Sequence, residues 1–568
     1  MPESRLSTDI STSSDFEEQS RSNAQGVASI PITEQQHHRN WFSWPTNRPL
    51  FSSTSRLSTL EPSNRSWSEF WKLFKGFLGP GFLISVGYLD PGNWATDLAA
   101  GSQFGYRLLF IILMSSLMAM LLQSLCVRLG VVTGLDLAQC CRKHFSKPVA
   151  LFLYVLCEIA IMATDLAEVI GAAIALKLLF NIPLLWGVLL TGLDVLVILA
   201  FGFNAKHIRV FEIGIGCLVF VTAVCLFIVA GKSGPVFRDV LIGYLPTLEI
   251  FTAPGSLAIA VGIIGATVMP HNLYLHSYIV KYRSKSDQGS IEEIDTFVME
   301  PTESTGDPTQ PLTRKSTLPS TLQMSYLDSI VALTFALFVN SSILIISSAN
   351  FYTRGLNDVA EIPDAFQLIG ESLGSSFSTL FAVALLLAAQ SSTITGTMAG
   401  QIVMDGFLGA AFQVKPWVRR LITRVFAIGP AIITILVFGS ESLNNLLIIS
   451  QIVLSAQLPF AVWPLVYFTS RKDLMTVTLQ DTSTREANRD SSDSLASMTP
   501  HQDTEEGPSF EMVPSSCCED SEMQTKVSGG KKVDFSNSMT INLFAILVAS
   551  LLTIFNIALL VEFARGHE

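Results

Sequence analysis

Residues 79–102 read GPGFLISVGYLDPGNWATDLAAGS, an apolar stretch that is interrupted at residues 90–93 by the tetrapeptide DPGN. A second apolar stretch, residues 257–268, runs without a charge into the tetrapeptide MPHN at residues 269–272. A proline removes a backbone donor and cannot continue a regular helix. Non-helical backbone at membrane depth persists only where it is buried in protein or lines a watery cavity. The two stretches therefore predict a pair of membrane helices that are broken at corresponding places.

The side chains at the two breaks indicate a cation site. Asp90 is an ionisable group inside a span. Burial of such a group costs free energy, and it usually marks a functional site, although Asp90 can also cap the half-helix that follows. Asn93 offers a neutral oxygen on the same side, or else satisfies broken backbone. The thioether of Met269 suits softer transition metals better than Ca²⁺ or Mg²⁺, and its place at the break favours a ligand over simple packing. Backbone carbonyls freed by the breaks, near Gly87 and Ala266, are natural further ligands.

The composition is that of a polytopic membrane protein. The chain has 568 residues, of which 49% are hydrophobic and 15% charged, and its mean hydropathy is +0.45. Soluble domains carry about 25% charged residues. The eight cysteines include no Cys-x-x-Cys pair and are expected to be buried or idle thiols. We find no nucleophile–base arrangement, nucleotide loop or zinc-protease motif, so the sequence argues against an enzyme, and no cofactor or nucleic-acid partner is expected.

Apolar runs of about 20 residues or more predict membrane spans. Eleven such spans are expected, at 76–99, 107–132, 149–179, 183–203, 209–231, 251–281, 323–349, 374–409, 417–438, 443–469 and 538–563. Lysine and arginine are concentrated in the loops that follow the even-numbered spans. Because positive loops stay on the cytosolic side, we expect a cytosolic N-terminus and a C-terminus on the opposite side.

Three polar segments are expected to be disordered and cytosolic. They are the tail 1–70 and the inserts 283–322 and 471–537, in which we see neither helical nor strand periodicity. Their Ser, Thr and acidic residues make them candidates for binding regulatory proteins or kinases. The membrane part is then divided into residues 71–282, 323–470 and 538–568.

Spans 1–5 can be laid over spans 6–10, with a broken span at the start of each half. Because five is odd, the second half enters the membrane from the opposite side, which is the inverted repeat of secondary transporters. We therefore expect an all-α polytopic membrane protein with a 5+5 inverted repeat, broken helices 1 and 6, and an eleventh helix outside the repeat. Such broken helices favour alternating access over a channel.

Further polar residues lie inside the other spans. Glu158, Asp165 and Glu168 share roughly one face of span 3, which indicates a proton or ion path, or ion pairs with arginines of span 9. The candidate partners are Arg419, Arg420 and Arg424, and path and pairing can be one network. His271 is expected to ligate metal or carry a proton, and His276 to be structural or peripheral. Gln123 and Gln451 either reach the site or make interhelical hydrogen bonds.

The chain resembles the Nramp (natural resistance-associated macrophage protein) family of divalent metal transporters. The resemblance covers about 75–280 and 323–470, and is carried by GPGFLISVGYLDPGNWATDLAAGS, LMAMLLQSLCVRLGVVTG, EIAIMATDLAEVIGAA, GIIGATVMPHNLYLHS, QSSTITGTMAGQIVMDGF, RRLITR and SQIVLSAQLPFAVWPL. It implies a leucine-transporter-like fold and proton-coupled import of Mn²⁺ and Fe²⁺ into the cytosol. The eleven spans and long inserts are typical of a eukaryotic, fungal-like member.

By that resemblance each candidate residue receives a role. The implied metal ligands are Asp90, Asn93, Met269 and the carbonyl of Ala266, joined by Gln123 and Gln451 in some conformations. The implied proton route uses Asp90, His271, Asp165 and Glu168, with Glu158 and an arginine at 419 or 420 in the same network.

A sensor or receptor on the same fold is the alternative, and the polar inserts would then serve signalling. The membrane is expected to be the plasma membrane or an endosomal or vacuolar membrane.

Overall fold

The computed structural model describes residues 85, 87–192, 205–286, 313–315, 318–355, 361–409, 416–439, 442–480 and 531–565. The tail predicted at 1–70 and most of both inserts lie outside these ranges. Within the described residues, eight stretches are long and apolar enough to cross a membrane. The first of them, Gly87–Thr133, joins the predicted spans 1 and 2. The prediction of an all-α polytopic membrane protein is confirmed.

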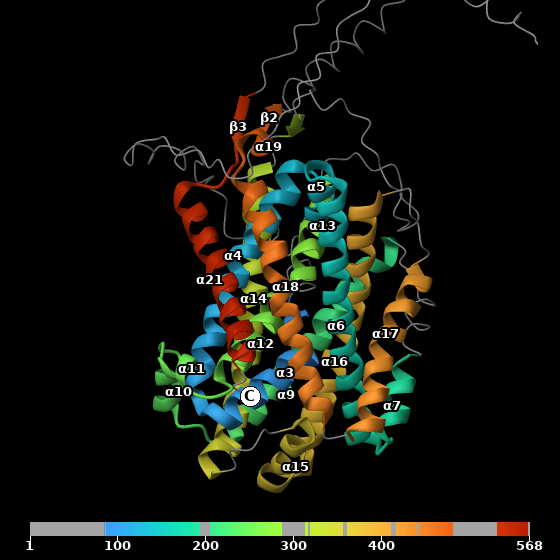
Figure 1. The fold of residues 1–568 in the computed structure, drawn as a ribbon, viewed down its shortest axis with the longest axis vertical. Helices are drawn as coiled ribbons and strands as arrows, with labels where there is room; N and C mark the ends of the chain where they lie inside the picture. Colours follow the sequence, from blue (N-terminus) through green and yellow to red (C-terminus); the bar gives the residue numbers. More distant parts are fainter. Residues whose placement is uncertain are drawn as a thin grey trace, which may run out of the picture. The chain divides into compact units, whose positions relative to one another are not determined.

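The helices follow most of the predicted spans to within a few residues, while residues 76–84 of the first predicted span and 193–203 of the fourth lie outside the described residues. The main elements are α3 (Pro91–Phe104), α4 (Leu109–Thr133), α6 (Lys147–Phe180), α7 (Leu184–Thr191), α9 (Ala205–Lys232), α12 (Ser256–Val268), α13 (Pro270–Ser286), α14 (Leu318–Asn350), α16 (Ser375–Leu408), α17 (Pro416–Val437), α18 (Leu443–Ser470) and α21 (Met539–Ala564) (Figure 1). The shorter helices α5 (Leu137–His144), α10 (Phe237–Gly243), α11 (Glu249–Thr252), α15 (Ile362–Leu373) and α19 (Lys472–Met475) connect them, as do the 3-10 turns η1 (Gly87–Leu89), η2 (Gly105–Leu108) and η3 (Tyr352–Arg354).

The first break has a local cause. Asp90 has an extended backbone (φ −66°, ψ 161°) and is the N-cap of α3, with Pro91 in the first turn. Its Oδ1 accepts a hydrogen bond from the backbone N–H of Asn93 at 3.0 Å. A carboxylate at an N-cap satisfies an orphan donor, and proline is preorganised for the first helical turn. The chain therefore changes from η1 to α3 at the residues where the sequence predicts the break.

The second break interrupts one apolar helix without a loop. α12 ends at Val268, Met269 has a positive φ of 36°, and α13 begins directly at Pro270. Proline has no backbone N–H and clashes with the preceding turn, so α12 cannot continue through residue 270. The two predicted broken helices are thus present, α12–α13 entirely and the first one from η1 onward.

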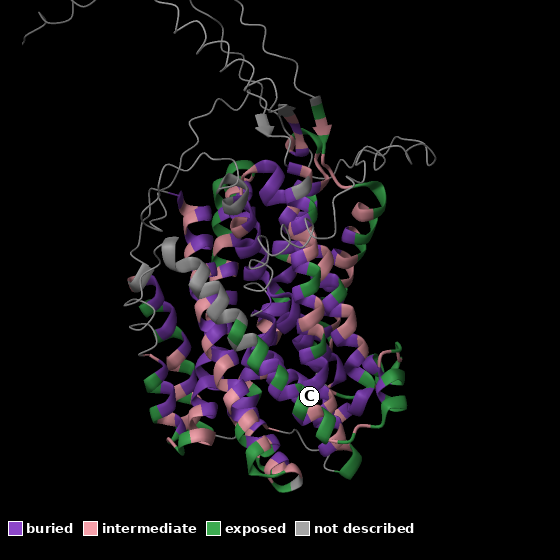
Figure 2. Ribbon diagram, turned by 180° about the vertical axis from the view of Figure 1, so that it is seen from behind, coloured by how far each residue is buried: buried purple, intermediate pink, exposed green. Residues whose placement is uncertain are grey.

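The packing of the helices agrees with an inverted repeat. α3, which opens the first half, packs on α14, the second helix of the other half, and α12 in turn packs on α4. The third helices of the two halves, α6 and α16, make the most extensive contact in the described chain. Figure 2 shows buried residues on the inner faces of the helices and exposed ones on the outer faces. The outer faces of the helices expose large apolar side chains, such as Phe220 on α9, Phe426 on α17 and Leu543 on α21. Such faces are suited to contact with lipid.

The ends of the two inserts form a small sheet, which the sequence analysis did not predict. β1 (Thr313–Lys315) pairs parallel with β2 (Thr476–Gln480), and β2 pairs antiparallel with β3 (Lys531–Asp534), in the order β1-β2-β3. In addition, α13 extends to Ser286 and α14 begins at Leu318. The expectation of disorder throughout 283–322 and 471–537 is therefore wrong at these residues. The strands are too short for a periodic signal, and their stability comes from partners distant in sequence.

One asparagine fixes the end of the second insert against three long helices. The backbone N–H of Asn537 donates to the Thr469 carbonyl at 3.1 Å, and its Nδ2 donates to Thr469 Oγ1 at 2.9 Å. Arg128 of α4 donates from Nη1 to Asn537 Oδ1 at 3.0 Å and from Nε to the Tyr326 hydroxyl at 3.1 Å. α4, α14 and α18 are therefore tied together at the end where the sheet lies.

We predict that Gly171→Ala destabilises the protein through the first break. A Cβ on Gly171 would overlap the ring of Pro91, because α6 passes directly against the break. Overpacking of this kind costs about 1–3 kcal/mol. The matched control is Gly231→Ala, where a Cβ would meet nothing within 4 Å and helix propensity improves. Thermal unfolding of both purified variants in detergent measures the difference, and equal midpoints would contradict the close contact.

Candidate metal-binding site

The two breaks lie against one another. Nδ2 of Asn93 donates to Oδ1 of Asp90 on its own side, and also to the carbonyl oxygen of Ala266 on α12 at 3.0 Å. Asp90, Asn93 and Ala266 are all fully buried. The predicted ligand residues Asp90, Asn93 and Ala266 are thus brought together, although they come from separate halves of the chain.

Met269 and Gln451 complete this junction. Met269 is fully buried at the second break, and its Sδ accepts a hydrogen bond from Asn272 Nδ2 at 3.6 Å. Gln451 on α18 places its side-chain amide against Gly92, so close that a Cβ there would overlap it, and its backbone oxygen faces Gly265. α18 therefore inserts Gln451 between the two breaks, where the sequence analysis left its role open.

Several buried oxygens at the junction have no hydrogen-bond partner among the described residues. They are Asp90 Oδ2, Gln451 Oε1, Asn272 Oδ1 and Asn340 Oδ1. All are acceptors, and buried acceptors without a donor are costly. A cation removes this cost, because carboxylate and amide oxygens beside a thioether form a mixed hard and soft ligand set. The arrangement fits a divalent transition-metal ion as substrate.

Gln123 lies beside the junction, within a chain of hydrogen bonds. Its Nε2 donates to the Tyr88 hydroxyl at 2.8 Å, and its Oε1 is 2.7 Å from Nδ1 of His276. Nε2 of His276 is 3.3 Å from the hydroxyl of Ser329 on α14. In this structure Gln123 is thus engaged away from Asp90. His276 is buried and hydrogen-bonded to Gln123 and Ser329, which favours the structural alternative over the peripheral one.

Three polar residues near the breaks were not predicted from the sequence as candidate site residues. Asn272 lies in the MPHN motif itself, and Asn340 on α14 donates from Nδ2 to Asn93 Oδ1 at 3.2 Å. Asp97 on α3 is buried, and within the described residues neither of its carboxylate oxygens has a hydrogen-bond partner. A carboxylate inside a span is a visible signal, as it was for Asp90. The two amides carry no charge and leave the hydropathy of their spans almost unchanged.

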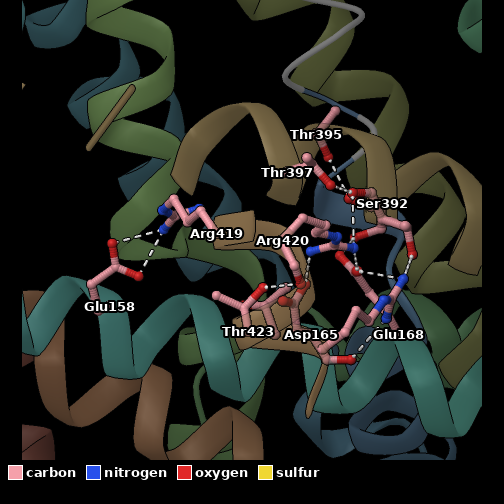
Figure 3. A network of polar contacts seen from close by, with 12 residues as sticks. Glu158, Asp165, Glu168, Ser392, Thr395, Thr397, Arg419, Arg420 and Thr423 are labelled. Atoms are coloured by element: carbon pink, nitrogen blue, oxygen red, sulfur yellow. Dashed lines mark hydrogen bonds and ion pairs between the residues drawn. The ribbon is translucent and has the colours of Figure 1, made fainter. Parts of the chain in front are cut away.

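The carboxylates of α6 face the arginines of α17, as the pairing hypothesis predicts. Arg419 Nη2 is 2.7 Å from both oxygens of Glu158. Arg420 pairs with Asp165 and lies 3.5 Å from Glu168. Figure 3 shows the Glu158–Arg419 pair standing apart from the cluster that contains Asp165, Glu168 and Arg420. Opposite charges at this range make burial in a membrane protein tolerable.

This ion-pair network adjoins the first break. Ser392 on α16 donates to Glu168 Oε1 at 3.0 Å, and Arg424 donates from Nη2 to Thr393 Oγ1 at 3.0 Å. Gly171, one helical turn beyond Glu168, is the residue that packs against Pro91. The buried charges are therefore next to the candidate metal site. His271 is buried in the first turn of α13, and its Nδ1 has no partner among the residues described.

Comparisons with known proteins identify the family of the chain. A family model described as "Natural resistance-associated macrophage protein-like" matches residues 81–484. The chain is 51% identical to a divalent metal cation transporter, MntH, of Nostoc sp. over 432 residues, which cover 76% of the chain and 90% of that relative. It is 49% identical to MntH of Listeria welshimeri over 76% of the chain and 88% of the relative.

A solved structure is similar over nearly the whole length. The crystal structure of the Eremococcus coleocola manganese transporter matches with a TM-score of 0.64 and 32% identity, covering 87% of each chain. The leucine-transporter-like fold with broken helices, which we expected from the sequence, is confirmed.

Proposed function

The chain belongs to the Nramp family of divalent metal transporters, and on that premise we propose that it carries Mn²⁺ and Fe²⁺ into the cytosol, coupled to protons, by alternating access. It is an integral multi-pass membrane protein. The observation that carries the proposal is the convergence of unpartnered buried oxygens and a thioether where the two breaks meet. The manganese transporter of Eremococcus coleocola, which has the same fold, supports manganese as one substrate.

Metal selectivity follows from the donor set. Asp90 supplies the charge, Asn93, Gln451 and the Ala266 carbonyl supply neutral oxygens, and Met269 supplies a sulfur. A sulfur in the ligand set disfavours Ca²⁺ and Mg²⁺, which bind oxygen, and favours softer divalent ions. Gln123 joins the site once it leaves Tyr88 and His276. The carbonyl of Gly87 is a further candidate ligand, because η1 ends directly before Asp90.

Proton movement would use the charges beside the site. A divalent cation next to Asp90 repels a proton on nearby groups, so metal binding favours proton release. The route would run through His271 to Asp165 and Glu168, whose charges are balanced by Arg420 and Arg424. Glu158 and Arg419 extend the same row of charges along α6.

The orientation follows from the positive loops. A cytosolic N-terminus, as the lysine and arginine distribution predicts, places the sheet and both inserts in the cytosol, where regulatory proteins or kinases would reach them.

Uptake by reconstituted protein tests the function. We expect Mn²⁺ uptake that an inward proton gradient stimulates, with Ca²⁺ largely excluded. Met269→Ala should lower the ratio of Mn²⁺ to Ca²⁺ uptake about tenfold. This corresponds to a loss of about 1.4 kcal/mol in the free energy of Mn²⁺ binding when the soft ligand is removed. The control Met404→Ala removes another buried thioether, on α16, and should keep the wild-type ratio. Folded protein that binds Mn²⁺ without any flux would instead support a sensor.

A second variant tests the proton route. Asp165→Asn removes one carboxylate from the cluster around Arg420 and is expected to flatten the dependence of Mn²⁺ uptake on external pH. The control is Glu249→Gln, since Glu249 forms an exposed pair with Arg107 at 2.8 Å. Uptake rates over a pH series in proteoliposomes provide the measurement. If Asp165→Asn kept the wild-type pH profile, the proposed route through α6 would be wrong.

A further inference from the structure

Asn272 makes two hydrogen bonds to the same residue, Met269. Its side-chain Nδ2 donates to Met269 Sδ at 3.6 Å, and its backbone N–H donates to the Met269 carbonyl at 3.2 Å. Asn272 itself is buried in the first turn of α13. One residue thus holds both the backbone and the sulfur of the candidate soft ligand.

The backbone of Met269 needs such support. Its φ of 36° is positive, a conformation that residues other than glycine rarely adopt. The described residues contain one other non-glycine case, Asn181, which caps the end of α6 and belongs to a residue type that tolerates the left-handed region. A long, unbranched side chain such as methionine has no such preference. Strained backbone of this kind persists only where the surroundings hold it, and it is concentrated at binding sites.

The carboxamide of Asn272 also lies against Gly87. A Cβ on Gly87 would overlap Asn272 Nδ2 and would lie 3.2 Å from both Cγ and Oδ1. Gly87 belongs to η1, directly before the first break. The side chain of Asn272 is therefore packed between Met269 at the second break and Gly87 beside the first.

We propose that Asn272 is a positioning residue that sets the metal selectivity of the site by orienting the thioether of Met269. The inference rests on the proposed transport function. A thioether sulfur has two lone pairs, and the N–H of Asn272 occupies one of them. The other lone pair then has a fixed direction, so a soft metal ion meets a preorganised ligand. Without this hydrogen bond the flexible methionine side chain samples other rotamers, and the advantage of Mn²⁺ over Ca²⁺ falls.

A double-mutant cycle tests this role. The variants are Asn272→Leu, which has similar size and no donor, Met269→Ala, and the pair together. Uptake of Mn²⁺ and Ca²⁺ into proteoliposomes gives the selectivity ratio and the split between KM and maximal rate. We expect Asn272→Leu to lower the ratio about tenfold, as loss of a residue that orients a ligand commonly does, mainly through a higher KM for Mn²⁺. In the Met269→Ala background the same change should have less than about a twofold effect, because coupled residues are not additive.

The controls separate this inference from a general loss of structure. Asn556→Leu removes another buried amide, which donates to the Ser455 and Leu552 carbonyls at 3.0 Å and 2.8 Å, and should keep the wild-type ratio. Asn272→Ser, which removes bulk instead of adding apolar surface, should lower the ratio in the same direction. It is measured in place of Asn272→Leu if the leucine variant unfolds.

Two kinds of failure remain distinguishable. If the wild-type protein transports Mn²⁺ and Met269→Ala leaves the ratio of Mn²⁺ to Ca²⁺ uptake unchanged, Met269 is not a selectivity-determining ligand. The premise of the positioning role then fails as well. If Met269→Ala lowers the ratio while both Asn272 variants keep it, the positioning role is overturned. It is equally overturned if the effects of Asn272→Leu and Met269→Ala add in full.

Discussion

The side-chain amide of Asn93 links the two halves of the protein at their breaks. Nδ2 of Asn93 bonds to Asp90 on its own helix and to the Ala266 carbonyl, at 3.0 Å, on the other. Each proline leaves backbone groups without helical partners at a depth where lipid offers none. The two breaks lie against each other, so polar groups of one break satisfy those of the other. The candidate metal ligands are side chains at this contact. The site is thus a consequence of how the broken backbone is satisfied.

The parts of this account that were predictable from sequence depend on local signals. A proline or a carboxylate in an apolar run is visible without any partner, which is why both breaks, Asp90 and Met269 were identified. The same holds for the carboxylates of α6 and the arginines at 419 and 420, because charges are rare in spans. Which arginine meets which carboxylate was not predictable, since it depends on how α17 lies along α6.

The parts that were missed depend on distant contacts or on uncharged groups. β1, β2 and β3 are short and become stable only by pairing across two inserts, which no local pattern predicts. Asn272 and Asn340 are neutral amides whose importance arises from what they contact, Met269 in one case and Asn93 in the other. Gln123 was correctly singled out as polar within a span, but its engagement with Tyr88 and His276 depends on the conformation of the helices.

The central claim is that the two breaks form one metal site with both a carboxylate and a thioether as ligands. Anomalous X-ray diffraction at the manganese edge, from crystals of the protein grown with Mn²⁺, tests this most directly. The account predicts an anomalous peak within ligand distance of both an Asp90 oxygen and Met269 Sδ. A peak bound to protein oxygens elsewhere, with none between the two breaks, would contradict it.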